Sequence, residues 1–270
     1  MDNLRSLKLR LPTPLGHNAL DSATRSFDAL RDVSLDCKQA SLDDAIAFLR
    51  AISSPHLESV RLDHCECPTS SLATSLLEFC TVLHNKFRST VRSISLSVTP
   101  IGSPIVFEHP LVKYLEPLLH IHELAEFRFA ISRTSRNVSI PVPESNLVSI
   151  AESWPRLSHL GLNYDPADEP PTVWTISTFA WRCPSLTTLN LPCIDARDVA
   201  FASLDSPHPS LISFGIFDGG WDSLIPEPGN LAKFLKALFP KVVLEQPQLG
   251  AEQWTQTVEC LEKLQAVVGS

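Results

Sequence analysis

An apolar spacing of the form L-x-x-L-x-L recurs nine times along the chain, with each apolar position filled by Leu, Val, Ile or Phe. The triplets are Leu4/Leu7/Leu9, Leu30/Val33/Leu35, Leu57/Val60/Leu62, Val91/Ile94/Leu96, Leu124/Phe127/Phe129, Leu157/Leu160/Leu162, Leu186/Leu189/Leu191, Leu211/Phe214/Ile216 and Phe239/Val242/Leu244. The last two members of each triplet share one face of an extended segment, which predicts one short strand per triplet. Successive triplets begin 25 to 34 residues apart. This interval predicts an array of similar units that bury their apolar faces against one another.

Proline supplies a second regularity that does not depend on the choice of triplets. Pro55, Pro155, Pro184 and Pro209 each stand two residues before a triplet. The fixed φ and missing N–H of proline suit a turn that enters a strand. The same positions therefore predict a turn at the start of several units.

The segments between triplets have helical periodicity. The clearest runs from Ser41 to Ile52, where Ser41 and Asp44 are spaced as a capping box and the apolar residues fall on one face. Residues 251–268 predict a C-terminal capping helix with Trp254, Val258, Leu261 and Val268 inward. The expected fold is an α/β leucine-rich-repeat solenoid of about nine irregular repeats. It has a curved parallel sheet with helices on its outer face and forms a single domain over residues 1–270.

The two ends of the predicted array differ. The first triplet begins three residues after Met1, so the sequence supplies no element to cover the apolar edge of the first repeat. We therefore expect an N-terminal cap to be missing and the chain to be a fragment or a shortened gene model.

Composition narrows the class of partner. The chain has 270 residues, 44% hydrophobic and 19% charged, with a formal net charge of −8 and a pI near 5.6. This acidic balance argues against nucleic acid and anionic membrane as partners. Seven cysteines without framework spacing indicate reduced thiols, and residues 1–15 lack the apolar core of a signal peptide. We expect an intracellular protein, cytoplasmic or nuclear.

Candidate chemistry is sparse. The sequence contains no G-x-S-x-G, H-E-x-x-H, G-x-x-x-x-G-K-[ST] or G-x-G-x-x-G motif. The clusters His64-Cys65-Glu66-Cys67 and His120-Ile121-His122-Glu123 resemble metal ligands, but neither has a second pair of ligands to complete a zinc site. We predict no catalytic residue, metal, cofactor or small-molecule ligand, and therefore no enzyme.

Candidate binding residues come from two places. Residues between the apolar members of each triplet point away from the core, and loops rich in Pro, Gly, Ser and Asp follow the strands at 97–108, 131–145, 163–173 and 217–229. These loops are expected along one rim, where they form a binding surface or are neutral insertions. The candidate partner-binding residues are Arg61, Asp63, Glu126, Arg128, His159, Asn163, Tyr164, Asn190, Phe217 and Trp221. Trp154 and Trp181 are expected to pack in the core instead.

Three stretches resemble the repeat regions of fungal F-box and leucine-rich-repeat proteins. They are Pro155-Arg-Leu-Ser-His-Leu-Gly-Leu162, Cys183-Pro-Ser-Leu-Thr-Thr-Leu-Asn-Leu191 and Phe234-Leu-Lys-Ala-Leu-Phe-Pro240. The resemblance implies a substrate-recognition region of an F-box-like ubiquitin-ligase receptor, with a substrate protein as partner. No F-box helix precedes the first repeat, so a ligase adaptor is expected only if an F-box lies upstream. The alternative is a stand-alone intracellular scaffold or inhibitor that binds another protein.

Overall fold

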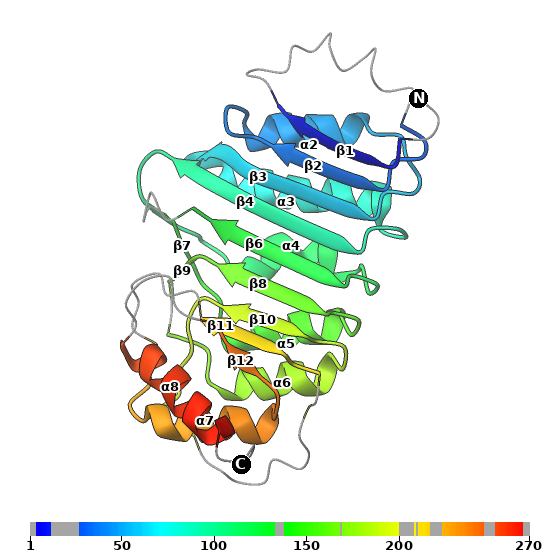
Figure 1. Cartoon of the computed structure of the whole chain (residues 1–270). Helices are drawn as coiled ribbons and strands as arrows, with labels where there is room; N and C mark the ends of the chain where they lie inside the picture. The colour runs from blue at the N-terminus through cyan, green and yellow to red at the C-terminus, as the bar shows by residue number, and fades with distance from the viewer. Residues whose placement is uncertain are drawn as a thin grey trace.

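The computed structural model has an α/β fold built on a nine-stranded sheet, in which every strand pair is parallel. It describes residues 4–11, 27–132, 138–167, 169–199, 208, 210–216, 223–245 and 252–266. The strands follow the order of the chain (Figure 1): β1 (Ser6–Arg10), β2 (Asp32–Asp36), β3 (Ser59–Pro68), β4 (Ser93–Ile101), β6 (Glu126–Ile131), β8 (His159–Asn163), β10 (Thr188–Leu191), β11 (Ser213–Ile216) and β12 (Val243–Leu244). Each triplet contributes one strand, as the apolar spacing predicts.

The register of the sheet aligns the first eight triplets. Their middle members pair from strand to strand, as in Val60 with Ile94 and Leu160 with Leu189. Apolar side chains at equivalent positions thus stack in a continuous row beneath the sheet, where Val60, Ile94, Phe127 and Leu160 are almost fully buried. Four to five residues before its paired middle member, a strand is entered through a turn, such as Pro155–Arg156 before Leu160.

The last triplet is placed wrongly by the sequence pattern. Leu244, and not Val242, pairs with Phe214. The amide of Val242 bonds to the carbonyl of Phe239, as the amide of Leu157 bonds to that of Trp154, so Val242 occupies the first apolar position of its unit. One residue fewer separates the first two apolar positions in this unit than in the others.

The described residues contain seven helices. They are α2 (Leu42–Ala51), α3 (Thr69–Phe87), α4 (Leu111–Leu119), α5 (Glu144–Ser153), α6 (Trp174–Arg182), α7 (Pro228–Leu238) and α8 (Glu252–Ala266). Helices α2 to α6 cover one face of the sheet, and α7 and α8 pack at its C-terminal end (Figure 1). Ser41 and Asp44 form the predicted capping box of α2. Helix α8 buries Trp254, Val258 and Leu261 as expected, and Val268 lies outside the described residues. None of these helices is long and apolar enough to cross a bilayer.

Three of the four insertions expected as rim loops contain hydrogen-bonded strands. A second, three-stranded parallel sheet joins β5 (Ile105–Val106), β7 (Val138–Ile140) and β9 (Asp165–Pro166). Val138 and Ile140 are buried beneath it. Isolated bridges continue the pattern from Thr172 through Asp195 to Leu224, the last of which belongs to the fourth insertion. The described part of this rim is therefore tied to the core, because its backbone groups bond to neighbouring units.

The two tryptophans expected in the core differ. Trp154 is fully buried and donates its indole N–H to the Leu118 carbonyl at 3.0 Å. Trp181 is 58% exposed, so its predicted place in the core is wrong. Trp154 and Cys183 both follow the end of a helix and both precede a proline, and the amide of each bonds to the carbonyl four residues earlier. Cys183 therefore occupies the position equivalent to Trp154, and Trp181 lies on the solvent side of α6.

Candidate functional site

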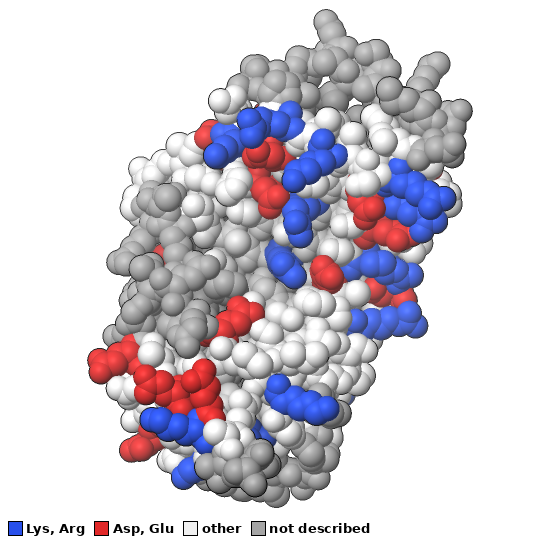
Figure 2. All heavy atoms as spheres, in the orientation of Figure 1, with Lys and Arg blue, Asp and Glu red and all other residues white. Residues whose placement is uncertain are grey.

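A central column of side chains crosses the face of the sheet that carries no helices. Its members pair in register from β1 to β11 and are Lys8, Ser34, Arg61, Ser95, Arg128, Gly161, Asn190 and Gly215. This column is the one that the triplet spacing predicts. In Figure 2, Lys and Arg side chains run down this face from β1 toward β6, and acidic side chains gather near α8.

The second half of the column opens into a depression of about 500 Å³, which we call the central hollow. The polar residues of its lining are Ser95, Ser97, Arg128, His159, Asn163, Thr188, Asn190 and Glu245. Four of the predicted binding residues thus meet here, namely Arg128, His159, Asn163 and Asn190. Arg61, Asp63 and Glu126 lie on the same face, outside this lining. The volume is within the usual range of ligand sites, roughly 300–1,000 Å³.

Two glycines in the column shape the hollow. Gly161 lines its floor, where a β-carbon would meet only the aliphatic stem of Arg128 at 3.5 Å. Gly215 is buried, and a β-carbon there would lie 2.5 Å from Asn190 Oδ1 and 3.1 Å from Glu245 Oε2. Asn190 and Glu245 therefore fold down over Gly215 because that position has no side chain. The missing side chain at Gly161 therefore keeps the floor of the hollow open, whereas the missing side chain at Gly215 leaves space for Asn190 and Glu245, which form the wall of the hollow.

Glu245 is the wall residue that sequence reasoning missed. Its amide bonds to the Phe214 carbonyl at 2.9 Å, its carboxylate accepts a hydrogen bond from Ser213 Oγ at 2.5 Å, and its own carbonyl accepts the Trp254 indole N–H at 2.9 Å. These contacts make Glu245 the next member of the column after Gly215. The shifted spacing of the last triplet hid this position, because the pattern placed the final strand two residues too early.

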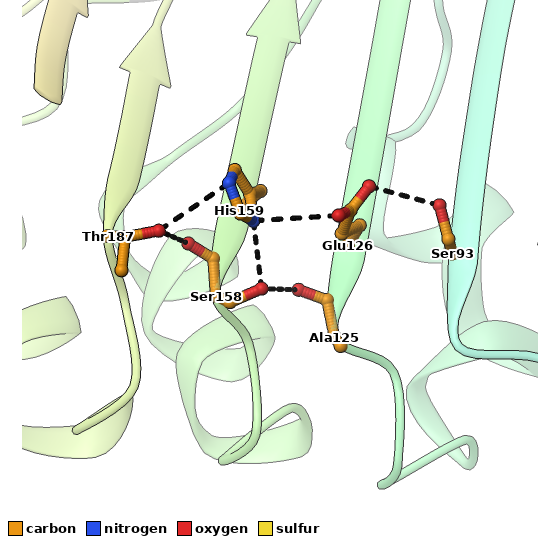
Figure 3. A network of polar contacts seen from close by, with 6 residues as sticks. All are labelled: Ser93, Ala125, Glu126, Ser158, His159 and Thr187. Atoms are coloured by element: carbon orange, nitrogen blue, oxygen red, sulfur yellow. Dashed lines mark hydrogen bonds and ion pairs between the residues drawn. The ribbon is translucent and has the colours of Figure 1, made fainter.

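A polar network lies beside the hollow, between β4 and β10 (Figure 3). Ser93 Oγ donates to Glu126 Oε2 at 3.1 Å, and Glu126 Oε1 is 3.7 Å from His159 Nδ1. Ser158 Oγ is 2.8 Å from the same Nδ1, and Thr187 Oγ1 is 3.5 Å from His159 Nε2. The imidazole is thus held on both nitrogens by neighbouring strands, which fixes the orientation of its ring.

This network does not have the geometry of an activated nucleophile. In a Ser-His-acid triad the acid and the serine bind opposite nitrogens of the imidazole. Here Glu126 and Ser158 both approach Nδ1, and the Ser158 hydroxyl donates its proton to the Ala125 carbonyl at 2.9 Å. Thr187 on the other nitrogen donates to the Ser158 carbonyl at 3.0 Å. Both hydroxyl protons are therefore used by the backbone, and the arrangement fixes the orientation of the His159 ring beside the hollow.

Tyr164 was expected on the binding surface, but it is buried with 3% of its area exposed. Its ring lies 6.3 Å from that of Phe129, and burial raises the pKa of its phenol well above the usual value. Tyr164 is four residues beyond Leu160 and therefore continues the core-facing alternation of the strand. Phe217 and Trp221, the other aromatic candidates, lie outside the described residues.

The residues of the two clusters of potential metal ligands make separate packing contacts in the structure. Cys65 and Cys67 are buried, while His64 is exposed with a φ of 60° at the irregularity where β3 shifts register against β4. Contact with the Cys37 thiol and burial raise the pKa of Cys65, so the thiol is protonated at neutral pH. His122 Nδ1 lies 3.1 Å from the Ser153 carbonyl, and His120 packs against His84. Across the ranges that the structure describes, no three His, Cys, Asp or Glu side chains group as a metal site.

A scan against protein-family models finds no match for this chain, and a search of curated proteins finds none either. The hollow and the column are therefore interpreted from their own geometry.

Proposed function

We propose that this chain is a leucine-rich-repeat solenoid that binds another protein through the open face of its nine-stranded sheet. The observation that carries the proposal is the central hollow, where side chains from separate units converge on a face that none of the described helices covers. Its lining mixes one guanidinium, one carboxylate, hydroxyls and amides, which suits the varied polar groups of a polypeptide. The sequential parallel order of the strands and the recurring apolar spacing support the repeat interpretation.

The resemblance to fungal F-box proteins supports a more specific proposal. The module would be the substrate-recognition region of an F-box-like ubiquitin-ligase receptor, with no enzymatic activity of its own. None of the seven cysteines forms a disulfide, which is compatible with a reducing, intracellular compartment. A stand-alone scaffold or inhibitor would use the same face but would have no ligase adaptor as partner.

Affinity capture of the native protein from its own cells tests both proposals. The wild-type chain should retain a partner that an Arg128→Ala variant of equal thermal stability binds more weakly. Arg156→Ala provides a matched control, because Arg156 is an exposed arginine that is ion-paired with Glu123 and absent from the hollow. Co-purification of a ligase adaptor supports the receptor proposal, and a partner without the adaptor supports the scaffold. Failure to capture any protein would contradict the binding proposal.

A further inference from the structure

The central hollow is electrically asymmetric. Arg128 lies on β6 at one side, and Glu245 follows β12 at the other. Both residues are exposed, and neither forms an ion pair with any residue in the part of the chain that is described. Some other arginines, such as Arg92 and Arg156, are paired with a carboxylate, whereas the exposed Arg61 and Arg88 have no ion pair among the described residues. The hollow therefore presents an unneutralised positive group and an unneutralised negative group to the same occupant.

The separation of these charges sets the length of that occupant. Strands β8, β10 and β11 lie between β6 and β12, so four inter-strand steps separate the two backbones. At ~4.8 Å per step this distance is roughly 19 Å. An extended chain advances ~3.3 Å per residue, and long side chains on both partners shorten the distance to be covered. Two charged residues separated by about three to five positions in an extended segment match this span.

The floor between the charges suits the backbone of such a segment. Gly161 has no side chain, so a polypeptide can approach the sheet closely there. Thr188 on β10 presents a hydroxyl group on the same floor, and Ser95 and Ser97 on β4 extend the polar lining beyond Arg128. Asn190 Oδ1 is buried and has no hydrogen-bond partner among the described residues, so the Asn190 side chain has an acceptor that is still to be satisfied. These groups match the alternating donors and acceptors of a peptide backbone.

We propose that the central hollow binds an extended segment of a partner protein that lies across the strands, with an acidic side chain at Arg128 and a basic side chain at Glu245. The inference rests on the proposed function and specifies the partner of that site. A carboxylate forms a two-pronged pair with a guanidinium. A more highly charged anion is disfavoured, because Glu126 on β6 and Glu245 bring negative charge to the same face while Arg128 is the lining's one arginine.

Selection of a phage-displayed random peptide library on the immobilised full chain tests this inference. Peptides selected on the wild type should carry one acidic and one basic residue separated by about three to five positions. Synthetic copies should bind the wild type at least tenfold more tightly than either Arg128→Glu or Glu245→Lys. Binding to the Arg128→Glu variant should return when the acidic residue of the peptide is replaced by lysine.

Arg61→Glu is the matched control, because Arg61 occupies the same column and undergoes the same charge reversal outside the hollow. This variant should bind the selected peptides as the wild type does. Selected peptides without paired charges, equal binding to Arg128→Glu and Arg61→Glu, or no selected peptides at all would overturn the inference. If Arg128→Glu and Glu245→Lys still capture a cellular partner as the wild type does, the peptide inference fails while the proposed protein-binding function stands.

Discussion

The two halves of the open sheet face share one core spacing but differ in what they expose. From β1 to β6 the central column alternates cations with small hydroxyl side chains, ending at Arg128. From β8 to β12 it consists of two glycines, one asparagine and one glutamate. Beneath both halves the buried positions pair in the same register. Packing therefore fixes the apolar rows, whereas the outward positions are free to vary, and the hollow forms where the outward side chains are smallest.

The largest expected effect comes from the core that both halves share. Leu62→Ala in β3 and Leu160→Ala in β8 remove side chains that are almost fully buried. Each should lower the free energy of unfolding by ~2–5 kcal/mol, because each leaves a cavity. Urea unfolding followed by circular dichroism measures the loss. Leu9→Ala is the control, because Leu9 is 37% exposed at the edge strand and should cost far less. A large difference between the Leu62 and Leu160 variants would show that the two halves do not share an equivalent core.

The two glycines of the second half should differ in their response to an added methyl group. Gly215→Ala places a carbon against the side chains of Asn190 and Glu245, which can turn away, so we expect a loss of about 1 kcal/mol, at the low end for overpacking. Gly161→Ala meets ordinary van der Waals space and should change stability by less than about 0.5 kcal/mol. Thermal unfolding of both variants measures the contrast.

A double variant identifies the cause of the Gly215 effect. Asn190→Ala removes the nearest clashing atom, so Gly215→Ala combined with Asn190→Ala should lose less than the sum of the two single changes. Additive losses would show that the strain arises elsewhere, for example in the backbone of β11.

Binding should depend more on the residues that line the hollow than on the rest of the column. Arg128→Ala should weaken partner binding about tenfold or more without altering stability, because its guanidinium lines the hollow without an ion partner among the described residues. Arg61→Ala, on the same column but outside the hollow, should have a smaller effect. Titration calorimetry with the captured partner compares the two. A greater loss for Arg61→Ala would move the binding surface to the charged half.

Much of this architecture could be predicted from the sequence, because burial imposes a spacing that any solvent-facing substitution leaves intact. The strands and the aligned column followed from eight triplets. The ninth was misplaced because Phe239, at the end of α7, lies three residues before Val242 and completes a false triplet. Val242 is the first apolar position of the last unit, and Leu244 is the second. This spacing, taken without Phe239, indicates that Glu245 is the next outward position.

The second sheet, the position of Tyr164 and the depth of the hollow had weak, misinterpreted or absent signals in the sequence. Strands of the second sheet have two or three residues, too few to establish a period of two. Tyr164 did have a signal, since it falls on the buried parity of Leu160 and Leu162, but its hydroxyl and its place after a strand favoured the surface. The depth of the hollow depends on side-chain rotation over Gly215, a tertiary property that no local spacing encodes.

The smallest expected effect concerns charge along the rim of the second half. Hydrogen bonds that the Arg197 side chain donates to the Asp195 carboxylate hold the pKa of Asp195 below its usual value of 3.8. A depressed carboxyl pKa in the folded state stabilises the protein at pH values above 3.8, and this contribution fades as the pH falls through the folded-state pKa. Asp195→Asn should therefore lower stability at pH 7 by less than about 1 kcal/mol, because Arg197 is half-exposed. Denaturation at pH 7 and at pH 3 should show this difference shrinking toward zero. A difference that persists at pH 3 would assign the role of Asp195 to side-chain hydrogen bonds that asparagine does not reproduce, such as the one from the Arg197 amide, and not to its charge.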